Sequence, residues 1–124
     1  MEEKLEKILR AGEELVWQDG NLVCLKDKKG KYRLDTKSRK SILRQKNNAW
    51  LYRKKFDYIS SPENLICIVR LNKESRLLNI PSGTYLTSNL IYVLEYQGMG
   101  NYLFQQKDSE IVQSLKIENI KSWR

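Results

Sequence analysis

The heptapeptide LICIVRL, Leu65–Leu71, is apolar at six of its seven positions. An almost uninterrupted apolar run of this length is typical of a strand in the middle of a sheet, where both faces are covered. The hexapeptide RLLNIP, Arg76–Pro81, follows after a short polar turn and predicts a second strand. The sequence therefore predicts a sheet at the centre of the fold.

The residues that follow predict another hairpin. The segments NLIYVLEYQ and NYLFQQ, residues 89–97 and 101–106, flank the tripeptide GMG at residues 98–100. Two β-rich segments separated by a short glycine-containing turn are typical of a hairpin. The octapeptide EIVQSLKI, residues 110–117, fits either a strand or a short helix. The C-terminal half of the chain is thus expected to be rich in strands.

The N-terminal part predicts a short helix and three strands. Leu5, Ile8 and Leu9 share one face of a helix over Glu2–Ala11, with acidic residues in its first turn and Gly12 as a stop. Strands are then expected over residues 15–18, 22–26 and 31–36, joined by turns at QDGN and KDKKGK.

The middle of the chain predicts an amphipathic helix. Apolar and uncharged residues recur there at spacings of three and four, which is one face of a helix. They are Ile42, Gln45, Ala49, Tyr52, Phe56 and Ile59. Ser41 is a plausible N-cap, and SSPEN at residues 60–64 a plausible stop. The competing interpretation is that WLYRKKF, residues 50–56, is a strand. Taken together, the expected fold is α+β, with an N-terminal helix, a mostly antiparallel sheet and one central basic helix.

Positive charge is concentrated in the same middle segment. The formal net charge is +8, but residues 26–55 alone hold thirteen basic and two acidic residues, a net of +11. Such a concentration opposes compaction unless an anion neutralises it. A polyanion, nucleic acid first, is the expected partner, because arginine and lysine pair with phosphates. The alternatives are an ordinary solvated lysine-rich face, an acidic protein or a membrane surface.

Aromatic residues are interleaved with these charges, which suits stacking on unpaired bases. Tyr32, Trp50, Tyr52 and Tyr58 lie in or beside the basic run. Tyr52 lies on the apolar stripe and is expected to pack in a core, whereas Trp50 could equally pack in a core or face the basic side. The predicted nucleic-acid-binding residues are Lys28, Lys29, Lys31, Arg33, Arg39, Lys40, Arg44, Lys46, Trp50, Arg53, Lys54 and Lys55.

The stretch YRLDTKSRKS, residues 32–41, offers a catalytic alternative. It places an acid, a spacer and a lysine at a predicted strand end, and the element order of residues 1–81 resembles the PD-(D/E)xK nucleases, in particular small Holliday-junction resolvases. This resemblance implies that Asp35 would hold a magnesium ion and that Lys37 would help activate water. A second carboxylate, for which Asp19 is the nearest candidate, would complete the metal site.

Chance and register favour a non-catalytic interpretation of this motif. Fifteen acids and fifteen lysines in 124 residues give about 1.8 such triplets by chance, and the chain has three. The predicted hairpin places Asp35 opposite Leu22, within one residue, where the nuclease family has an acid. Asp19 would need a bulge or loop to approach the roughly 2 Å distance that a shared magnesium ion requires.

The absence of certain residues excludes other function classes. The chain has no histidine, which removes Ser–His and Cys–His catalysis and the usual histidine-containing zinc sites. Cys24 and Cys67 lie in apolar runs and are expected to be buried, reduced thiols. No run approaches the roughly 18 apolar residues of a membrane span, and the acidic N-terminus is no export signal, so a cytoplasmic location is expected.

These observations predict one domain over residues 1–124 that binds nucleic acid or a nucleoprotein complex, without catalysis and without a cofactor. The first alternative is the metal-dependent nuclease, with magnesium as its cofactor. The second is an inhibitor of the kind carried by phages or mobile elements, which would block a partner protein or a nucleoprotein complex.

Overall fold

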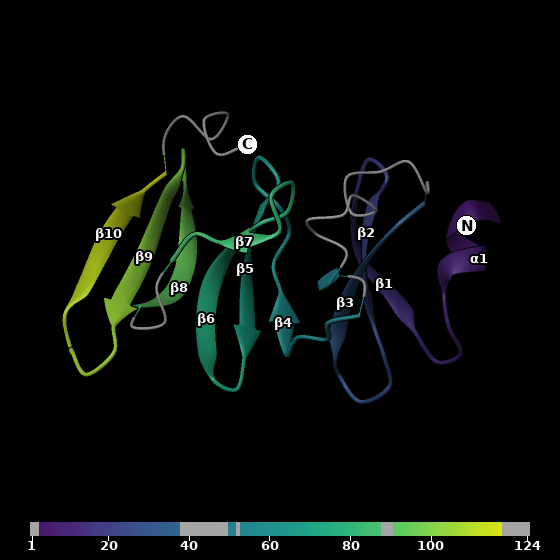
Figure 1. Ribbon diagram of the computed structural model, residues 1–124, viewed down its shortest axis with the longest axis horizontal. Helices are drawn as coiled ribbons and strands as arrows, with labels where there is room; N and C mark the ends of the chain where they lie inside the picture. The colour runs from purple at the N-terminus through teal and green to yellow at the C-terminus, as the bar shows by residue number, and fades with distance from the viewer. Residues whose placement is uncertain (1–2, 38–49, 52, 88–90, 118–124) are drawn as a thin grey trace.

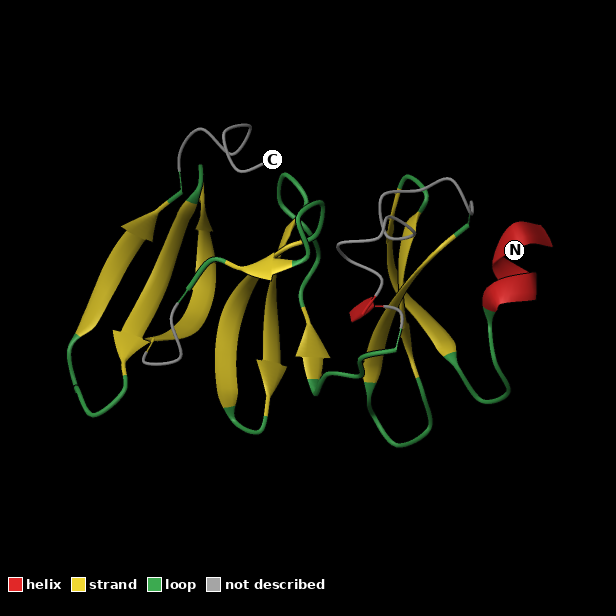
Figure 2. Cartoon of the chain, viewed as in Figure 1, coloured by secondary structure: helices red, strands yellow, loops and turns green. Residues whose placement is uncertain are grey.

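The computed structural model describes residues 3–37, 50–51, 53–87 and 91–117. This part of the chain forms three antiparallel sheets that follow one another along the long axis of the molecule (Figure 1). Its helix α1, Glu3–Ile8, lies beyond the first sheet, and no helix in the described ranges is longer (Figure 2). The expected α+β fold is therefore wrong, because the described chain is built almost entirely from strands.

The strands fall into three sheets that we name A, B and C. Sheet A contains β1, Glu14–Asp19, β2, Leu22–Lys26, and β3, Tyr32–Thr36, in that order. Sheet B contains β4, Tyr58–Ile59, β5, Ile66–Leu71, β6, Glu74–Asn79, and β7, Thr84–Tyr85. Sheet C has β9, Asn101–Gln106, between β8, Ile91–Gly98, and β10, Val112–Lys116. Within the described ranges, the strands and hairpins expected on either side of the middle segment are confirmed, and the segment left open at residues 110–117 contains a strand.

Sheet B is the middle layer, which explains the apolar run at its centre. Side chains alternate across a strand, so neighbouring residues face opposite sides. Cys67 and Val69 pack toward sheet A with Leu34, whereas Ile66 and Ile68 pack toward sheet C with Val93. A strand covered on both faces needs apolar residues at every position. LICIVRL therefore contributes apolar side chains to two cores, one on each face of sheet B.

Sheet A is covered on its other face by α1. Leu5 is buried against Val23 and Leu25, with Ile8 and Leu9 packed at the margin. The helix is shorter than expected, since the chain turns at Ala11 and Gly12, where Gly12 has φ +81°. The described part of the chain thus has four layers, with α1, sheet A, sheet B and sheet C in that order (Figure 1).

The GMG segment forms the turn between β8 and β9. Gly98, Met99 and Gly100 all have positive φ, which glycine adopts at no steric cost. A Cβ on Gly100 would lie 2.6 Å from the carbonyl oxygen of Ile117. Gly100 is therefore required both by its backbone conformation and by the close approach of the chain after β10.

The prediction of a central helix is wrong for the described part of that segment. Part of the segment lies outside the described ranges, namely residues 38–49 and Tyr52. Residues 38–49 include Ser41, Ile42, Gln45 and Ala49. The rest of that segment is not helical, because Trp50 and Leu51 form a short 3₁₀ turn and Phe56 exchanges two 2.8 Å backbone hydrogen bonds with Tyr32.

The apolar spacing in that segment therefore has another cause. Phe56 and Ile59 are both buried in the core between sheets A and B, as a helix would have placed them. However, their backbone groups pair with the edges of β3 and β5 instead of with each other. The alternative strand over residues 50–56 is not observed either, since in its described part strand pairing is limited to a single bridge at Phe56.

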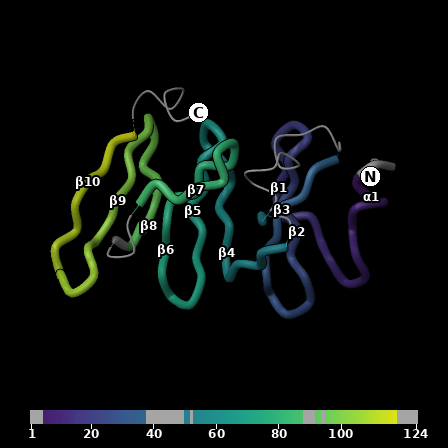
Figure 3. Tube along the Cα trace, viewed as in Figure 1, coloured from purple at the N-terminus to yellow at the C-terminus, as the bar shows by residue number. Residues whose placement is uncertain are grey.

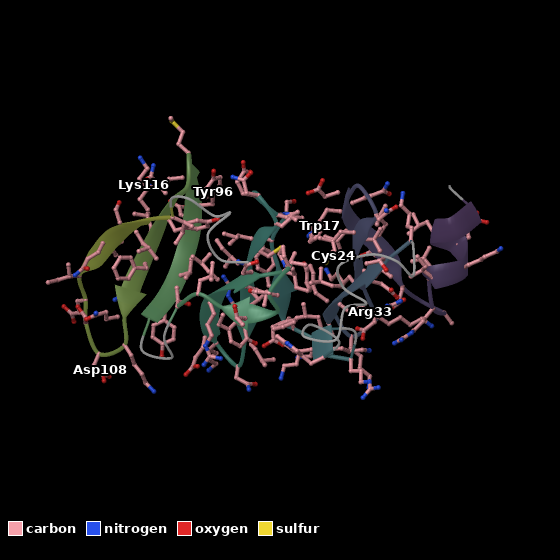
Figure 4. All side chains as sticks on the ribbon, turned by 45° about the horizontal axis from the view of Figure 1, so that its top comes forward. Trp17, Cys24, Arg33, Tyr96, Asp108 and Lys116 are labelled. Atoms are coloured by element: carbon pink, nitrogen blue, oxygen red, sulfur yellow. The ribbon has the colours of Figure 1, made fainter. Side chains whose placement is uncertain are left out.

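The two cysteines lie in the core between sheets A and B (Figure 4 labels Cys24). Burial raises the pKa of the Cys24 thiol to about 12 and raises the pKa of Cys67 as well. Because the thiolate is the reactive form, we expect a thiol reagent at pH 8 to modify neither cysteine in the folded protein and both in denaturant. Rapid modification without denaturant would contradict this placement.

In the described ranges, α1 is far too short to cross a membrane, and no other helix there is long and apolar enough to do so.

Candidate nucleic-acid interface

Three segments that are distant in sequence form one positively charged surface. They are residues 26–31 at the β2–β3 turn, residues 53–58 leading into β4, and residues 70–73 at the β5–β6 turn. Figure 3 shows the three along the same lower edge of the molecule. We call this set of residues the basic edge.

Backbone contacts join the three segments. Phe56 pairs with Tyr32 directly after the first segment, and the amide of Asp57 donates to the carbonyl of Arg70 over 2.8 Å. The amide of Asn72 in turn donates to Oδ2 of Asp57 over 3.0 Å. Asp57 therefore fixes the β5–β6 turn against the segment before β4, and the pairing of Phe56 with Tyr32 joins that segment to sheet A.

The basic edge keeps a large excess of positive charge. It holds nine basic residues and two acidic ones, a net of +7. Asp27 pairs with Lys55 at 2.8 Å, and Asp57 pairs with Lys31. The hydrogen bond from Lys55 holds the pKa of Asp27 at about 2, and that from Lys31 lowers the pKa of Asp57. Both acids therefore remain ionised at neutral pH, and seven cations are left over.

Most of the remaining cations are accessible to an anionic ligand. Lys28, Lys29 and Arg53 are exposed, as is Lys73 on the neighbouring turn, while Lys54 is half-buried. Within the described residues none of these five has an ion pair. Within the part of the chain that the structure describes, a polyanion would gain contacts here without first displacing an acidic partner.

Arg33 does not belong to this surface, although the sequence placed it there. Its side chain is 3% exposed and lies on the α1 side of sheet A (Figure 4). It donates to both carboxylate oxygens of Glu13 at 2.7 and 2.9 Å, to Oδ2 of Asp35 at 2.7 Å and to the carbonyl of Ile8 at 3.0 Å. The guanidinium thus joins α1, the following loop and β3.

The contact between Arg33 and Glu13 also shifts the pKa of both groups. The hydrogen bond from Arg33 is the largest cause that lowers the pKa of Glu13. Glu13 and Asp35 in turn raise the pKa of Arg33, against its burial. Arg33 and Glu13 therefore stay charged at neutral pH, and Arg33 holds α1 on sheet A.

Trp50 also packs inward. Its indole nitrogen donates to the carbonyl of Gly83 over 3.0 Å, and its ring meets Tyr85 edge to face at 5.9 Å. Trp50 and Tyr85 both lie at the margin of the core between sheets A and B. Trp17, which Figure 4 labels, lies at the margin of the same core. The structure therefore assigns Trp50 a packing role.

The structure brings together six of the predicted residues and adds three. Lys28, Lys29, Lys31, Arg53, Lys54 and Lys55 all lie on the basic edge. The predicted residues Arg39, Lys40, Arg44 and Lys46 lie outside the described ranges. Lys26, Arg70 and Lys73 join the surface without having been predicted to bind. The sequence signal that could have identified Arg70 and Lys73 was their place at the turn between the two central strands, which a sheet could bring beside the β2–β3 turn.

The structure does not bring together Asp19 and Asp35, the two metal ligands that the nuclease alternative needs. In sheet A, Asp35 lies opposite Val23, which lies opposite Gln18, whereas Asp19 lies opposite Leu22. Residues that are directly opposite share a face, so Asp19 and Asp35 lie on opposite faces of the sheet. Asp35 is also 9% exposed, and its two oxygens accept from Arg33 and from the amide of Thr36.

Lys37 follows β3, where its amide donates to the carbonyl of Asn21 over 2.8 Å. Within the described ranges, no three histidine, cysteine, aspartate or glutamate side chains lie close enough together to hold a metal ion.

Comparison with protein-family models, with curated proteins and with solved structures finds no match to this chain. The functional argument therefore depends on the chain's own residues.

Proposed function

We propose that this protein binds nucleic acid through the basic edge, without catalysing a reaction on it. The observation that supports the proposal is the net charge of +7 over three adjoining segments. Five of their cations have no ion pair within the described residues. Phosphate groups at regular spacing are the ligand that neutralises such a surface most completely. A cytoplasmic location, where nucleic acid is abundant, is part of the same proposal.

The salt dependence of binding tests this proposal. Each neutralised phosphate releases counterions, so a ligand that contacts six phosphates should lose about a thousandfold in affinity between 50 and 200 mM salt. We expect Arg53→Glu to weaken binding severalfold and to reduce the salt slope. The matched control is Lys107→Glu, which makes the same charge change at an exposed residue in the turn between β9 and β10.

Fluorescence anisotropy with labelled single-stranded DNA, duplex DNA and RNA provides the measurement. No binding to any of the three at low salt would contradict the proposal and would favour an acidic protein as the partner. Equal losses in Arg53→Glu and Lys107→Glu would show that the basic edge is not the contact surface. Cleavage of any probe that a chelator abolishes would contradict the non-catalytic part of the proposal.

A further inference from the structure

Aromatic side chains near the basic edge differ in how accessible they are. Trp50 is held by Gly83 and Tyr85, and Tyr32 is half-buried at the margin of the core. Tyr58 is 36% exposed, which makes it the most exposed aromatic side chain in the described ranges. Tyr52 lies outside these ranges. Of the three interleaved aromatic residues that the structure describes, Tyr58 is thus the one presented to solvent.

Tyr58 is held in place by its neighbours on the basic edge. Its ring meets Tyr32 edge to face, with ring centres 5.5 Å apart. The Arg70 guanidinium lies 5.3 Å from the centre of the Tyr58 ring, and Lys26 Nζ lies 5.6 Å from the centre of the Tyr32 ring. Its backbone pairs with Arg70 across β4 and β5. A ring constrained in this way loses little conformational entropy when a ligand stacks on it.

From this placement we infer that the basic edge takes single-stranded nucleic acid and that an unpaired base stacks on Tyr58. An exposed aromatic ring between cations offers a base a flat apolar surface and offers its flanking phosphates positive charge. A duplex can use only the charge, because its bases are paired and stacked internally. This inference rests on the proposed function and adds to it the class of nucleic acid that is preferred.

The experiment compares Tyr58→Leu with Tyr58→Phe, which keeps the ring. The probes are a single-stranded DNA, an RNA of the same sequence and the corresponding DNA duplex. Tyr92→Leu, at a half-buried tyrosine on sheet C, is the matched control. Thermal unfolding of each variant establishes that it is folded. Loss of stacking on one base should reduce single-strand affinity of Tyr58→Leu by about tenfold or more.

Duplex affinity should stay within about twofold in Tyr58→Leu, and Tyr58→Phe should retain single-strand binding. The salt slope should not change, because the substitution removes no lysine or arginine that could neutralise a phosphate. The relative loss for the DNA and RNA strands identifies which of the two the site prefers.

Three outcomes would overturn this inference. Equal affinity of Tyr58→Leu and the unchanged protein for both single strands would show that no base stacks on Tyr58, while an intact salt slope would leave the proposed function standing. Equal losses for the single strands and the duplex would show that the ring supports the surface instead of contacting a base. A chain that binds none of the three probes would overturn the proposed function as well.

Discussion

Replacing Arg33 with methionine should lower the free energy of unfolding by about 3–5 kcal/mol, which is the usual cost of removing one partner from a buried ion pair. The substitution leaves the Glu13 carboxylate buried, with a side chain 3% exposed and only the amide of Arg10 among its described partners. It also removes the hydrogen bond that ties the carbonyl of Ile8 to sheet A. Urea denaturation at pH 7 measures the loss.

The pH dependence separates charge from packing in this variant. Glu13 has a lowered pKa in the folded protein, so its stabilising contribution is present above the ordinary glutamate pKa and is lost as the pH falls through the lowered value. In Arg33→Met the same carboxyl is buried without its cation, so protonation relieves the penalty. The stability difference between the two proteins should therefore shrink from pH 7 to pH 4.

Two further variants test the explanation. Glu13→Gln in the Arg33→Met background should restore part of the lost stability, because it removes the uncompensated charge. Lys29→Met, which replaces an exposed cation of the basic edge, should change stability by no more than about 0.5 kcal/mol. A stability difference between Arg33→Met and the unchanged protein that is the same at both pH values would mean that lost packing, and not lost charge, is the cause.

Strand positions were predictable because they leave local signals. Turns such as KDKKGK and GMG separate segments of β-forming residues, and Asp35 was placed within one residue of its actual partner, Val23. An apolar run such as LICIVRL also indicates a strand that is covered on both sides. What covers each side is a matter of tertiary structure, so the four-layer arrangement could not be read from the chain.

The helix prediction failed because spacing alone does not determine backbone pairing. Phe56 and Ile59 are three residues apart, which places them on one side of a helix. A bend at Asp57 also directs both into the core, while the backbone on either side pairs with β3 and β5. The choice depended on the free edges of two strands that lie far away in sequence.

The candidate site shows a related limit. Net charge per segment located the basic edge, but it could not separate Arg33 from its neighbours. Arg33 differs from Lys29 and Lys31 because Glu13, twenty residues earlier, lies within 2.7 Å of it in the folded chain. Arg70 and Lys73 were not predicted, because they lie outside the basic run in sequence. Contacts of Asp57 with Arg70 and Asn72 bring their turn to the basic edge in the folded chain.

Truncating either of two adjacent leucines on β6 should lower the free energy of unfolding by a similarly large amount, although the two side chains lie in different cores. Leu77 and Leu78 are both 0% exposed, and Leu77 packs with Val93 between sheets B and C, whereas Leu78 packs between sheets A and B. Each substitution to alanine should lower the free energy of unfolding by about 2–5 kcal/mol. Ile111→Ala is the control, because that side chain is 66% exposed and its loss should cost little.

The same pair of variants tests whether the described sheets unfold together as the single domain that the sequence predicts. Trp17 and Trp50 report on the core between sheets A and B, in a Trp123→Phe background that removes the remaining tryptophan. Circular dichroism reports on all three sheets. If β6 couples both cores, Leu77→Ala should shift the fluorescence and dichroism transitions equally, although Leu77 itself packs only in the core beyond sheet B. If sheet C folds independently, dichroism should instead become biphasic while the fluorescence midpoint stays unchanged, and the single-domain prediction would fail.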